Sequence, residues 1–284
     1  MLELLSSHAC FGGDQRFYRH ESSVIGLPMK FSVFLPPQAS ETKVPALLYL
    51  AGLTCTEETF MTKAGAQRFA VEHGIALIAP DTSPRGAGIQ GEADAWDFGL
   101  GAGFYVDATV SPWAKHYRMY TYIVDELRET VIRNLPIDAG RLGICGHSMG
   151  GHGAIVLALR NPDVFRSVSA FAPIAAPSRC PWGEKAFTRY LGDDREVWRR
   201  YDASVLVAEG ARKFEAGILI DQGMADQFIA NQLNPDVLEA VCRDAGQPLT
   251  LRRHENYDHG YYFIQSFIAD HVRHHAATLH ALNC

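Results

Sequence analysis

The segment Gly146–Gly150 (GHSMG) contains the residue types that a serine nucleophile requires. It matches the pattern G-x-S-x-G, in which the serine occupies a sharp turn between a strand and a helix. Side chains two residues before and after such a serine would collide, so glycine is needed at both places. An apolar run, LGICGH, leads into Ser148, and a helix-competent run, GAIVLALR, follows it. This context favours a nucleophile at Ser148 over a chance pentapeptide.

A serine hydroxyl attacks efficiently only when a base takes its proton, and in this arrangement an acid and then a histidine follow the serine along the chain. The chain offers Asp226, on a loop predicted beyond a strand, and His259, on a loop before the last predicted helix. Asp221 is the rival acid, although its place at the strand end also suits a residue that holds the loop. The order of residues predicts a triad of Ser148, Asp226 and His259, with His259 as the base.

The other histidines are interpreted as structural. His254 falls within a predicted strand, and His147 and His152, beside the serine, are expected to make local hydrogen bonds. Three more histidines near the C-terminus have helical i, i+3, i+4 spacing, which could bind a metal, but no carboxylate or cysteine completes the set within that helix. We interpret them as a solvated helix end, and we expect neither a metal nor a cofactor. They are His271, His274 and His275.

Apolar strand-like runs alternate with helical patterns, which predicts a mostly parallel twisted sheet with helices on both faces. We expect about eight strands in one α/β domain over residues 1–284, beginning with antiparallel strands. Residues 82–112, rich in glycine and aromatic residues, predict a long ordered loop. The predicted strands cover residues 17–22, 30–35, 45–51, 75–80, 141–147, 167–172, 217–221 and 249–254. The predicted helices cover residues 64–73, 118–134, 149–160, 235–245 and 261–275.

Composition places the chain among ordinary globular proteins. Of 284 residues 47% are hydrophobic and 20% are charged, the net charge is −6, and no dense run of Lys and Arg is present. This balance argues against a disordered chain and against nucleic acid or an anionic membrane as a partner. The N-terminal residues lack the basic region of a secretory signal, and no run is long enough to span a bilayer. Six scattered cysteines fit reduced thiols, so we expect a cytoplasmic enzyme that acts on a small molecule.

Eight segments, spread from near the start of the chain to its last helix, match one known family. They are GLTCTEETF (52–60), APDTSPRG (79–86), AWDFGLGAGFYVDAT (95–109), YRMYTYIVDEL (117–127), GHSMGGHGA (146–154), PWG (181–183), LIDQGMADQF (219–228) and YDHGYYF (257–263). In these segments the chain resembles the S-formylglutathione hydrolases, also called the esterase D family. The resemblance implies the α/β-hydrolase fold, a homodimer, and hydrolysis of the thioester S-formylglutathione to glutathione and formate in formaldehyde detoxification.

The resemblance implies the same triad and adds an oxyanion hole, made by the backbone N–H groups of Leu53 and Met149. Two departures from the family pattern stand close to the triad. Gly260 follows the histidine where serine is common, and Met224-Ala225 precede the acid where a charged or acidic pair is common. Neither departure removes a catalytic group.

Selectivity for formyl, the smallest acyl group, requires a crowded acyl pocket. Trp182, in a segment predicted as a loop, is the leading candidate to crowd it, together with Trp96 and Phe98. For Trp96 a place in the core is equally open.

Glutathione is an anion, so an acidic protein needs local cations to bind it. The candidates are Lys63, Arg85 and Lys185. Cys55 follows the Leu53 turn, and its thiol is expected near Ser148, more as packing than as a catalyst.

Two alternatives stay open. The same triad would serve a broad short-chain carboxylesterase or an acyltransferase. From a different class, the fold could be an inactive binding module, but an intact Ser, Asp and His set with both flanking glycines argues against that.

Overall fold

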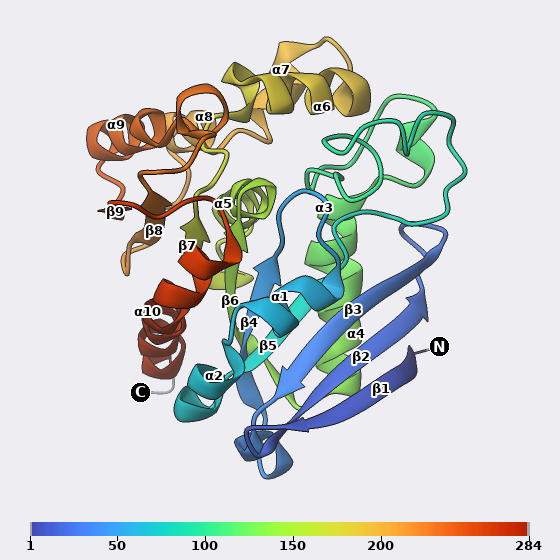
Figure 1. The fold of residues 1–284 in the computed structure, drawn as a ribbon, viewed down its shortest axis with the longest axis vertical. Helices are drawn as coiled ribbons and strands as arrows, with labels where there is room; N and C mark the ends of the chain where they lie inside the picture. The colour runs from blue at the N-terminus through green and yellow to red at the C-terminus, as the bar shows by residue number, and fades with distance from the viewer. Residues whose placement is uncertain (1, 283–284) are drawn as a thin grey trace.

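The computed structural model describes residues 2–282, and its centre is one sheet of nine strands in the order β1-β2-β3-β5-β4-β6-β7-β8-β9 (Figure 1). The pairs β1–β2, β2–β3 and β3–β5 are antiparallel, and the remaining pairs are parallel. The strands are β1 Leu2–Cys10, β2 Gly13–Glu21, β3 Pro28–Leu35, β4 Val44–Leu50, β5 Ala76–Pro80, β6 Ile137–His147, β7 Phe165–Phe171, β8 Ile218–Gly223 and β9 Leu249–His254.

The α-helices are α1 Glu57–Lys63, α2 Gln67–His73, α3 Met119–Thr121, α4 Arg128–Asn134, α5 Met149–Arg160, α6 Pro181–Leu191, α7 Arg195–Arg199, α8 Ala203–Ala208, α9 Pro235–Ala245 and α10 Tyr261–Ala281. The π-helix η3 Tyr122–Leu127 joins α3 to α4, and a second π-helix is η5 Ile229–Leu233. Short 3-10 turns are η1 Pro37–Ser40, η2 Trp113–Lys115 and η4 Pro177–Arg179.

Helices cover both faces of the sheet because neighbouring residues of a buried strand point to opposite faces. Along β6, Leu142 lies with Val131 of α4 on one face. Cys145 lies against His271 of α10 on the other face. Helices α1 and α2 share the α10 face, as the contact between α2 and α10 shows (Figure 1). The predicted mostly parallel sheet with helices on both faces is therefore confirmed.

The expected strand number was one too low, because β1 was not predicted. Most of its residues are exposed, and it pairs only with β2 at the edge of the sheet. An edge strand with no buried face needs no alternation of apolar and polar residues, so its sequence, LELLSSHAC, carries no periodic signal.

Four short helices, α1, α6, α7 and α8, were also not predicted. Their starts are nevertheless visible in the sequence. Thr56 accepts a hydrogen bond from the Glu58 N–H, and the Asp194 and Asp202 side chains cap α7 and α8 in the same way. Trp182 was wrongly assigned to a loop, because Pro181 opens α6 at its first position, where the missing N–H costs nothing.

The predicted loop over residues 82–112 is confirmed as ordered structure without a long helix or strand. Phe98, Phe104 and Tyr105 anchor it in the core, and the Tyr105 hydroxyl donates a 2.8 Å hydrogen bond to the Ala51 carbonyl. The Thr54 N–H donates to the Gly101 carbonyl at 2.9 Å, so the loop holds the turn after β4. Over residues 2–282 no helix is both long and apolar enough to cross a membrane.

Candidate active site

Ser148 lies between the end of β6 and the first residue of α5, with φ 57° and ψ −118°. This positive φ is strained for a side-chain-bearing residue, and a 3.0 Å hydrogen bond from its N–H to the Phe171 carbonyl helps hold it. A Cβ at Gly146 would lie 2.1 Å from the Gly150 carbonyl oxygen, and one at Gly150 would lie 1.9 Å from the Leu50 oxygen. The glycines flanking the serine are therefore required by backbone contacts.

Asp226 and His259 are joined by a 2.5 Å contact between Asp226 Oδ2 and His259 Nδ1. The second carboxylate oxygen accepts a 2.8 Å hydrogen bond from the Phe228 N–H, and the Asp226 side chain is buried. The His259 ring centroid is 4.5 Å from that of His147, the residue before Ser148. The pair therefore lies beside the serine, at the edge where the parallel strands β6, β8 and β9 end.

The loops that carry this pair are tied together by backbone hydrogen bonds. The Met224 N–H donates to the His254 carbonyl and the Ala225 N–H to the Tyr257 carbonyl, both at 2.9 Å. A Cβ at Gly223 would lie 2.4 Å from the Tyr257 oxygen, so the loops approach too closely for any side chain there. The Gly260 N–H donates a 2.8 Å hydrogen bond to the Asp258 side chain, which holds the loop after His259.

The two N–H groups assigned to the oxyanion hole border the serine. Met149 directly follows it, and a Cβ at Gly52, the neighbour of Leu53, would lie 3.2 Å from the Ser148 Cβ. Neither N–H donates to an acceptor within residues 2–282. Both donors are therefore available to a ligand.

The structure separates the rival acid, Asp221, from His259. Asp221 is fully buried and accepts two 2.6 Å hydrogen bonds from the Arg252 guanidinium and one of 3.2 Å from His271. Burial alone would raise the pKa of Asp221, but the hydrogen bonds from His271 and Arg252 outweigh it and hold the pKa well below its ordinary value.

The interpretation of the C-terminal histidines as a solvated helix end is wrong for His271 and His275, which are fully buried against the sheet. Helix α10 turns this face inward, and serines of β7 supply the polar partners. Within residues 2–282 no group of three or more His, Cys, Asp or Glu side chains is arranged to hold a metal ion.

The histidines beside the serine differ from each other. His152 is hydrogen-bonded as expected, from Nε2 to the Phe104 carbonyl at 3.1 Å, but this partner is 48 residues away rather than local, and Nδ1 has no partner among the described residues. For His147 that expectation is wrong, because neither ring nitrogen has a partner among the described residues, and burial lowers its pKa well below the ordinary value. His254 lies in β9 as predicted, with its ring 3.8 Å from that of Phe267.

An aromatic wall adjoins His259. The Phe228 ring is 5.0 Å from the His259 ring, and Trp182 packs against Phe228 at 4.7 Å. Trp96 stands edge-to-face 5.5 Å from Trp182, and with 56% of its surface exposed it is not a core residue. Phe98 is fully buried among other aromatic rings and is core rather than pocket wall, which corrects its candidacy.

Two of the three candidate cations already have carboxylate partners. Arg85 binds the buried Asp81 at 2.8 Å, and Lys185 binds Asp97 at 2.5 Å. Lys63 forms no ion pair within residues 2–282, and its ammonium group lies 5.8 Å from the centre of the Tyr261 ring.

Cys55 is partly buried in the turn after β4, close to Thr59 and Tyr261, and burial raises the pKa of its thiol. Its proximity to Ser148 stays a prediction. Cys284 lies outside the described residues.

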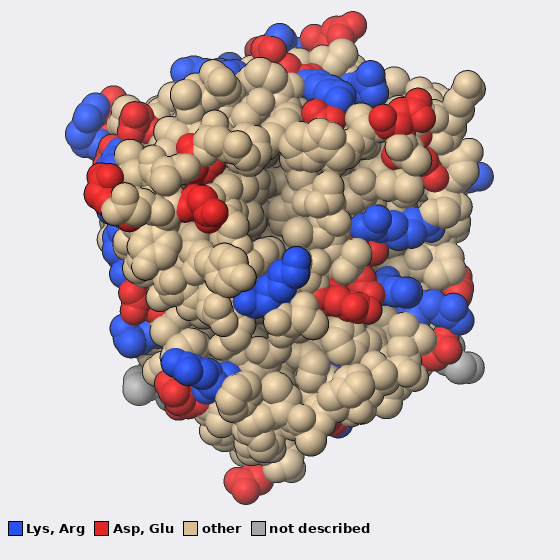
Figure 2. Space-filling model, viewed as in Figure 1, with Lys and Arg blue, Asp and Glu red and all other residues tan. Residues whose placement is uncertain are grey.

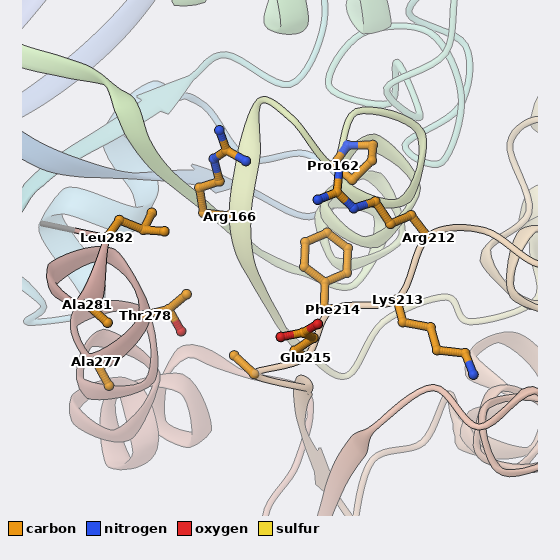
Figure 3. Close-up of a pocket in the computed structure, with 11 residues that line it drawn as sticks. Pro162, Arg166, Arg212, Lys213, Phe214, Glu215, Ala277, Thr278, Ala281 and Leu282 are labelled. Atoms are coloured by element: carbon orange, nitrogen blue, oxygen red, sulfur yellow. The ribbon is translucent and has the colours of Figure 1, made fainter. Parts of the chain in front are cut away.

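Cavities distinguish the two edges of the sheet. Figure 2 shows a hollow near the carboxyl ends of the central strands, with mostly uncharged walls. A cavity of about 590 Å³ lies at the opposite edge, lined by residues at the start of β7, before β8 and at the end of α10, among them Arg166, Phe214 and Thr278 (Figure 3). None of the predicted site residues lines that cavity.

Sequence analysis missed two residues that support the acid. Phe228 supplies both an N–H for Asp226 and a ring against His259, and the Gln222 amide lies 3.4 Å from Asp226 Oδ2. The signal for Phe228 was its position two residues after an aspartate, where an N–H can reach the carboxylate.

Comparisons with known proteins agree over nearly the whole chain. Residues 22–274 match the model of a family described as "Putative esterase". The S-formylglutathione hydrolase of Rattus norvegicus is 53% identical over 99% of this chain and 99% of its own length. The S-formylglutathione hydrolase of Paracoccus denitrificans (strain Pd 1222) is 52% identical over 98% of each chain. The solved structure of an S-formylglutathione hydrolase from Agrobacterium tumefaciens is 47% identical, with a TM-score of 0.95 over 97% of this chain and 99% of that chain.

Proposed function

Because this chain belongs to the S-formylglutathione hydrolase family and has the α/β-hydrolase fold, we propose that it hydrolyses S-formylglutathione to glutathione and formate. The observation that carries the proposal is identity of 52–54% to hydrolases of that name over at least 98% of the chain. The site supports it, because an aspartate–histidine pair stands beside a strained serine at the carboxyl edge of the sheet.

In the proposed mechanism Ser148 Oγ attacks the formyl carbon while His259 Nε2 takes the serine proton. The contact of Nδ1 with Asp226 leaves Nε2 as the free nitrogen and stabilises the imidazolium that forms. The N–H groups of Leu53 and Met149 stabilise the oxyanion of the tetrahedral intermediate.

The intermediate collapses when the carbon–sulfur bond breaks, and His259 returns the proton to the departing sulfur. Water then attacks the formyl-serine ester with His259 again as base. The bond between the formyl carbon and Ser148 Oγ breaks, His259 returns the proton to Oγ, and formate leaves. A thiol has a pKa of about 8.5 and can leave with little help, whereas an amine must be protonated before it can leave. Thioesters and activated esters therefore suit this site better than peptides.

Lys63 is the cation proposed to bind a carboxylate of glutathione. Arg85 and Lys185 already hold carboxylates, whereas Lys63 lies beside Tyr261, two residues after His259. Lys63→Met is expected to raise KM for S-formylglutathione several-fold and leave p-nitrophenyl acetate turnover unchanged, because only the first substrate is anionic. Lys115→Met serves as the control. An equal effect on both substrates would contradict the assignment.

The triad proposal is tested by fluorophosphonate labelling with peptide mapping. The label is expected on Ser148, and Ser148→Ala should lose several orders of magnitude in kcat while its thermal unfolding stays unchanged. Label on another residue, or retained hydrolysis, would overturn the assignment.

The substrate is tested separately by kcat/KM for S-formylglutathione against p-nitrophenyl acetate. We expect a clear preference for the thioester. Preference for the ester would favour a broad carboxylesterase on the same triad.

From its length and its scattered cysteines we also propose that the chain folds as one domain and works in the cytoplasm. On the family resemblance alone we propose that it forms a homodimer. Sedimentation at micromolar concentration should give twice the chain mass, and a monomer would contradict the dimer.

A further inference from the structure

Asp221 contacts both elements that bracket the loop bearing His259. That loop, residues 255–260, begins after β9 and ends where α10 starts. From β9, Arg252 donates to both Asp221 oxygens at 2.6 Å. From α10, His271 Nε2 lies 3.2 Å from Asp221 Oδ2. Asp221 itself belongs to β8, the strand that leads to Asp226.

Arg252 adds a direct link between the two bracketing elements. Its remaining terminal nitrogen donates a 2.7 Å hydrogen bond to Asp270 of α10. The buried carboxylate and this guanidinium thus join β8, β9 and α10 at one point, beneath the loops that hold Asp226 and His259.

The hydrogen bonds continue inward, and one consistent set of donors and acceptors has both histidines neutral. A carboxylate only accepts, so His271 Nε2 donates to Asp221 and its Nδ1 accepts from the Ser169 hydroxyl at 2.8 Å. His275 Nε2 then donates to Ser169 at 2.8 Å, and its Nδ1 accepts from the Ser167 hydroxyl at 2.6 Å. Both rings are neutral in this arrangement, and burial, the largest influence on each, lowers the pKa of both.

The backbone of β6 packs closely against this array. A Cβ at Gly143 would lie 2.6 Å from His275 Nδ1 and 2.7 Å from the Ser167 hydroxyl. The ring nitrogens of His271 and His275 and the hydroxyls of Ser167 and Ser169 all have hydrogen-bond partners. A connected network of this kind favours one arrangement of the elements that it joins.

We propose that Asp221, with Arg252 and His271, is a positioning residue that holds the Asp226–His259 pair in the geometry required for attack by Ser148. This inference rests on the proposed serine hydrolase function. Catalysis is sensitive to small displacements of such a pair, because the reacting groups must stay aligned within a fraction of an ångström.

The test compares Arg252→Met, Arg252→Lys and His271→Gln with wild type, using p-nitrophenyl acetate and counting active sites with fluorophosphonate. Arg253→Met is the matched control, because Arg253 is the next residue of β9 but binds Asp236 and Glu239 on the exposed side. Asp221→Asn extends the series if it folds.

For Arg252→Met we expect kcat per titrated site to fall about tenfold or more with little change in KM, as loss of alignment requires. The acid limb of the pH profile of kcat/KM should move to lower pH, because a displaced Asp226 stabilises the imidazolium less. Among residues 2–282, the titratable groups with contacts to the His259 ring are Asp226 and His147, and neither is altered in the variants. Arg252→Lys should recover part of the loss, and Arg253→Met should match wild type.

A purely structural role would lower the melting temperature and the fraction of titratable sites, and would leave kcat per site and the acid limb unchanged. That outcome would overturn the inference while the serine assignment stands. Failure of the wild-type protein to label at Ser148 would instead overturn the proposed function, so the two failures are distinguishable.

Discussion

Replacing Gly52 by alanine tests how closely the turn after β4 must approach the nucleophile. The new Cβ would lie 3.2 Å from both the Ser148 Cβ and His147 Nδ1. Carbon atoms prefer separations of about 3.5–4.0 Å, so the turn must move by a few tenths of an ångström. The corresponding change at Gly150 would place a Cβ 1.9 Å from the Leu50 carbonyl oxygen, which the backbone cannot accommodate without a larger shift.

The expected magnitude follows from the neighbour of Gly52. An oxyanion donor acts at about 2.7–3.1 Å, and complete loss of one donor lowers kcat by about 10²–10³. The Leu53 N–H would be displaced rather than lost, so we expect a fall of about 10- to 100-fold in kcat, with KM little changed. Overpacking costs about 1–3 kcal/mol, and two marginal contacts place Gly52→Ala near the lower end.

The assay measures kcat and KM for p-nitrophenyl acetate together with the free energy of unfolding in urea. Gly140→Ala is the control, because its Cβ would meet only the Asp138 side chain at 3.5 Å, an ordinary contact far from the site. A Gly52→Ala enzyme with kcat within twofold of wild type would refute the argument that this turn supplies an oxyanion donor.

Three further predictions concern side chains that are buried or partly buried. Alkylation of Cys55 should slow turnover by blocking the site. The alkylation itself should proceed faster at pH 9 than at pH 7, because burial raises the pKa of the thiol. A fully modified sample that keeps full activity would contradict the proximity of Cys55 to Ser148. Burial lowers the pKa of His152 to about 4, below the value of about 6.5 in the unfolded chain. The free energy of unfolding therefore has its full value above pH 6.5 and decreases as the pH falls toward 4, because the unfolded chain binds the proton first. The decrease is about 2 kcal/mol at pH 5. In urea unfolding, His152→Gln should reduce the difference in unfolding free energy between pH 7 and pH 5 by about that amount, and an unchanged difference would contradict a neutral buried ring. Trp182→Ala should raise kcat/KM for p-nitrophenyl butyrate relative to that for p-nitrophenyl acetate, because the Trp182 ring packs on Phe228 beside His259. An unchanged ratio of the two kcat/KM values would show that this ring does not border the acyl pocket.

Local patterns in the sequence were sufficient where a residue's role follows from its immediate neighbours. The elbow around Ser148 is such a case, because the collisions that demand glycine at positions 146 and 150 lie within five residues and one adjoining strand. The buried parallel strands were equally predictable, since their continuous apolar runs reflect burial on both faces.

Roles set by distant partners were not predictable in this way. Asp221 lies in β8 and Asp226 in the loop that follows it, so both were candidates for the catalytic acid. Their partners, Arg252 for Asp221 and His259 for Asp226, show which of the two can orient the base. The same holds for Arg85 and Lys185, whose charges are matched by carboxylates that no spacing rule connects to them.

Apolar periodicity and local sterics were enough to predict the fold class, the serine at the turn after β6 and the order of acid and base. Which aspartate meets the histidine, and which histidines are buried, became visible only in three dimensions. The tertiary structure also showed that His271 of α10 and Arg252 of β9 converge on the carboxylate of Asp221. Those outcomes depend on which side chains the twist of the sheet and the packing of α10 bring within hydrogen-bonding distance.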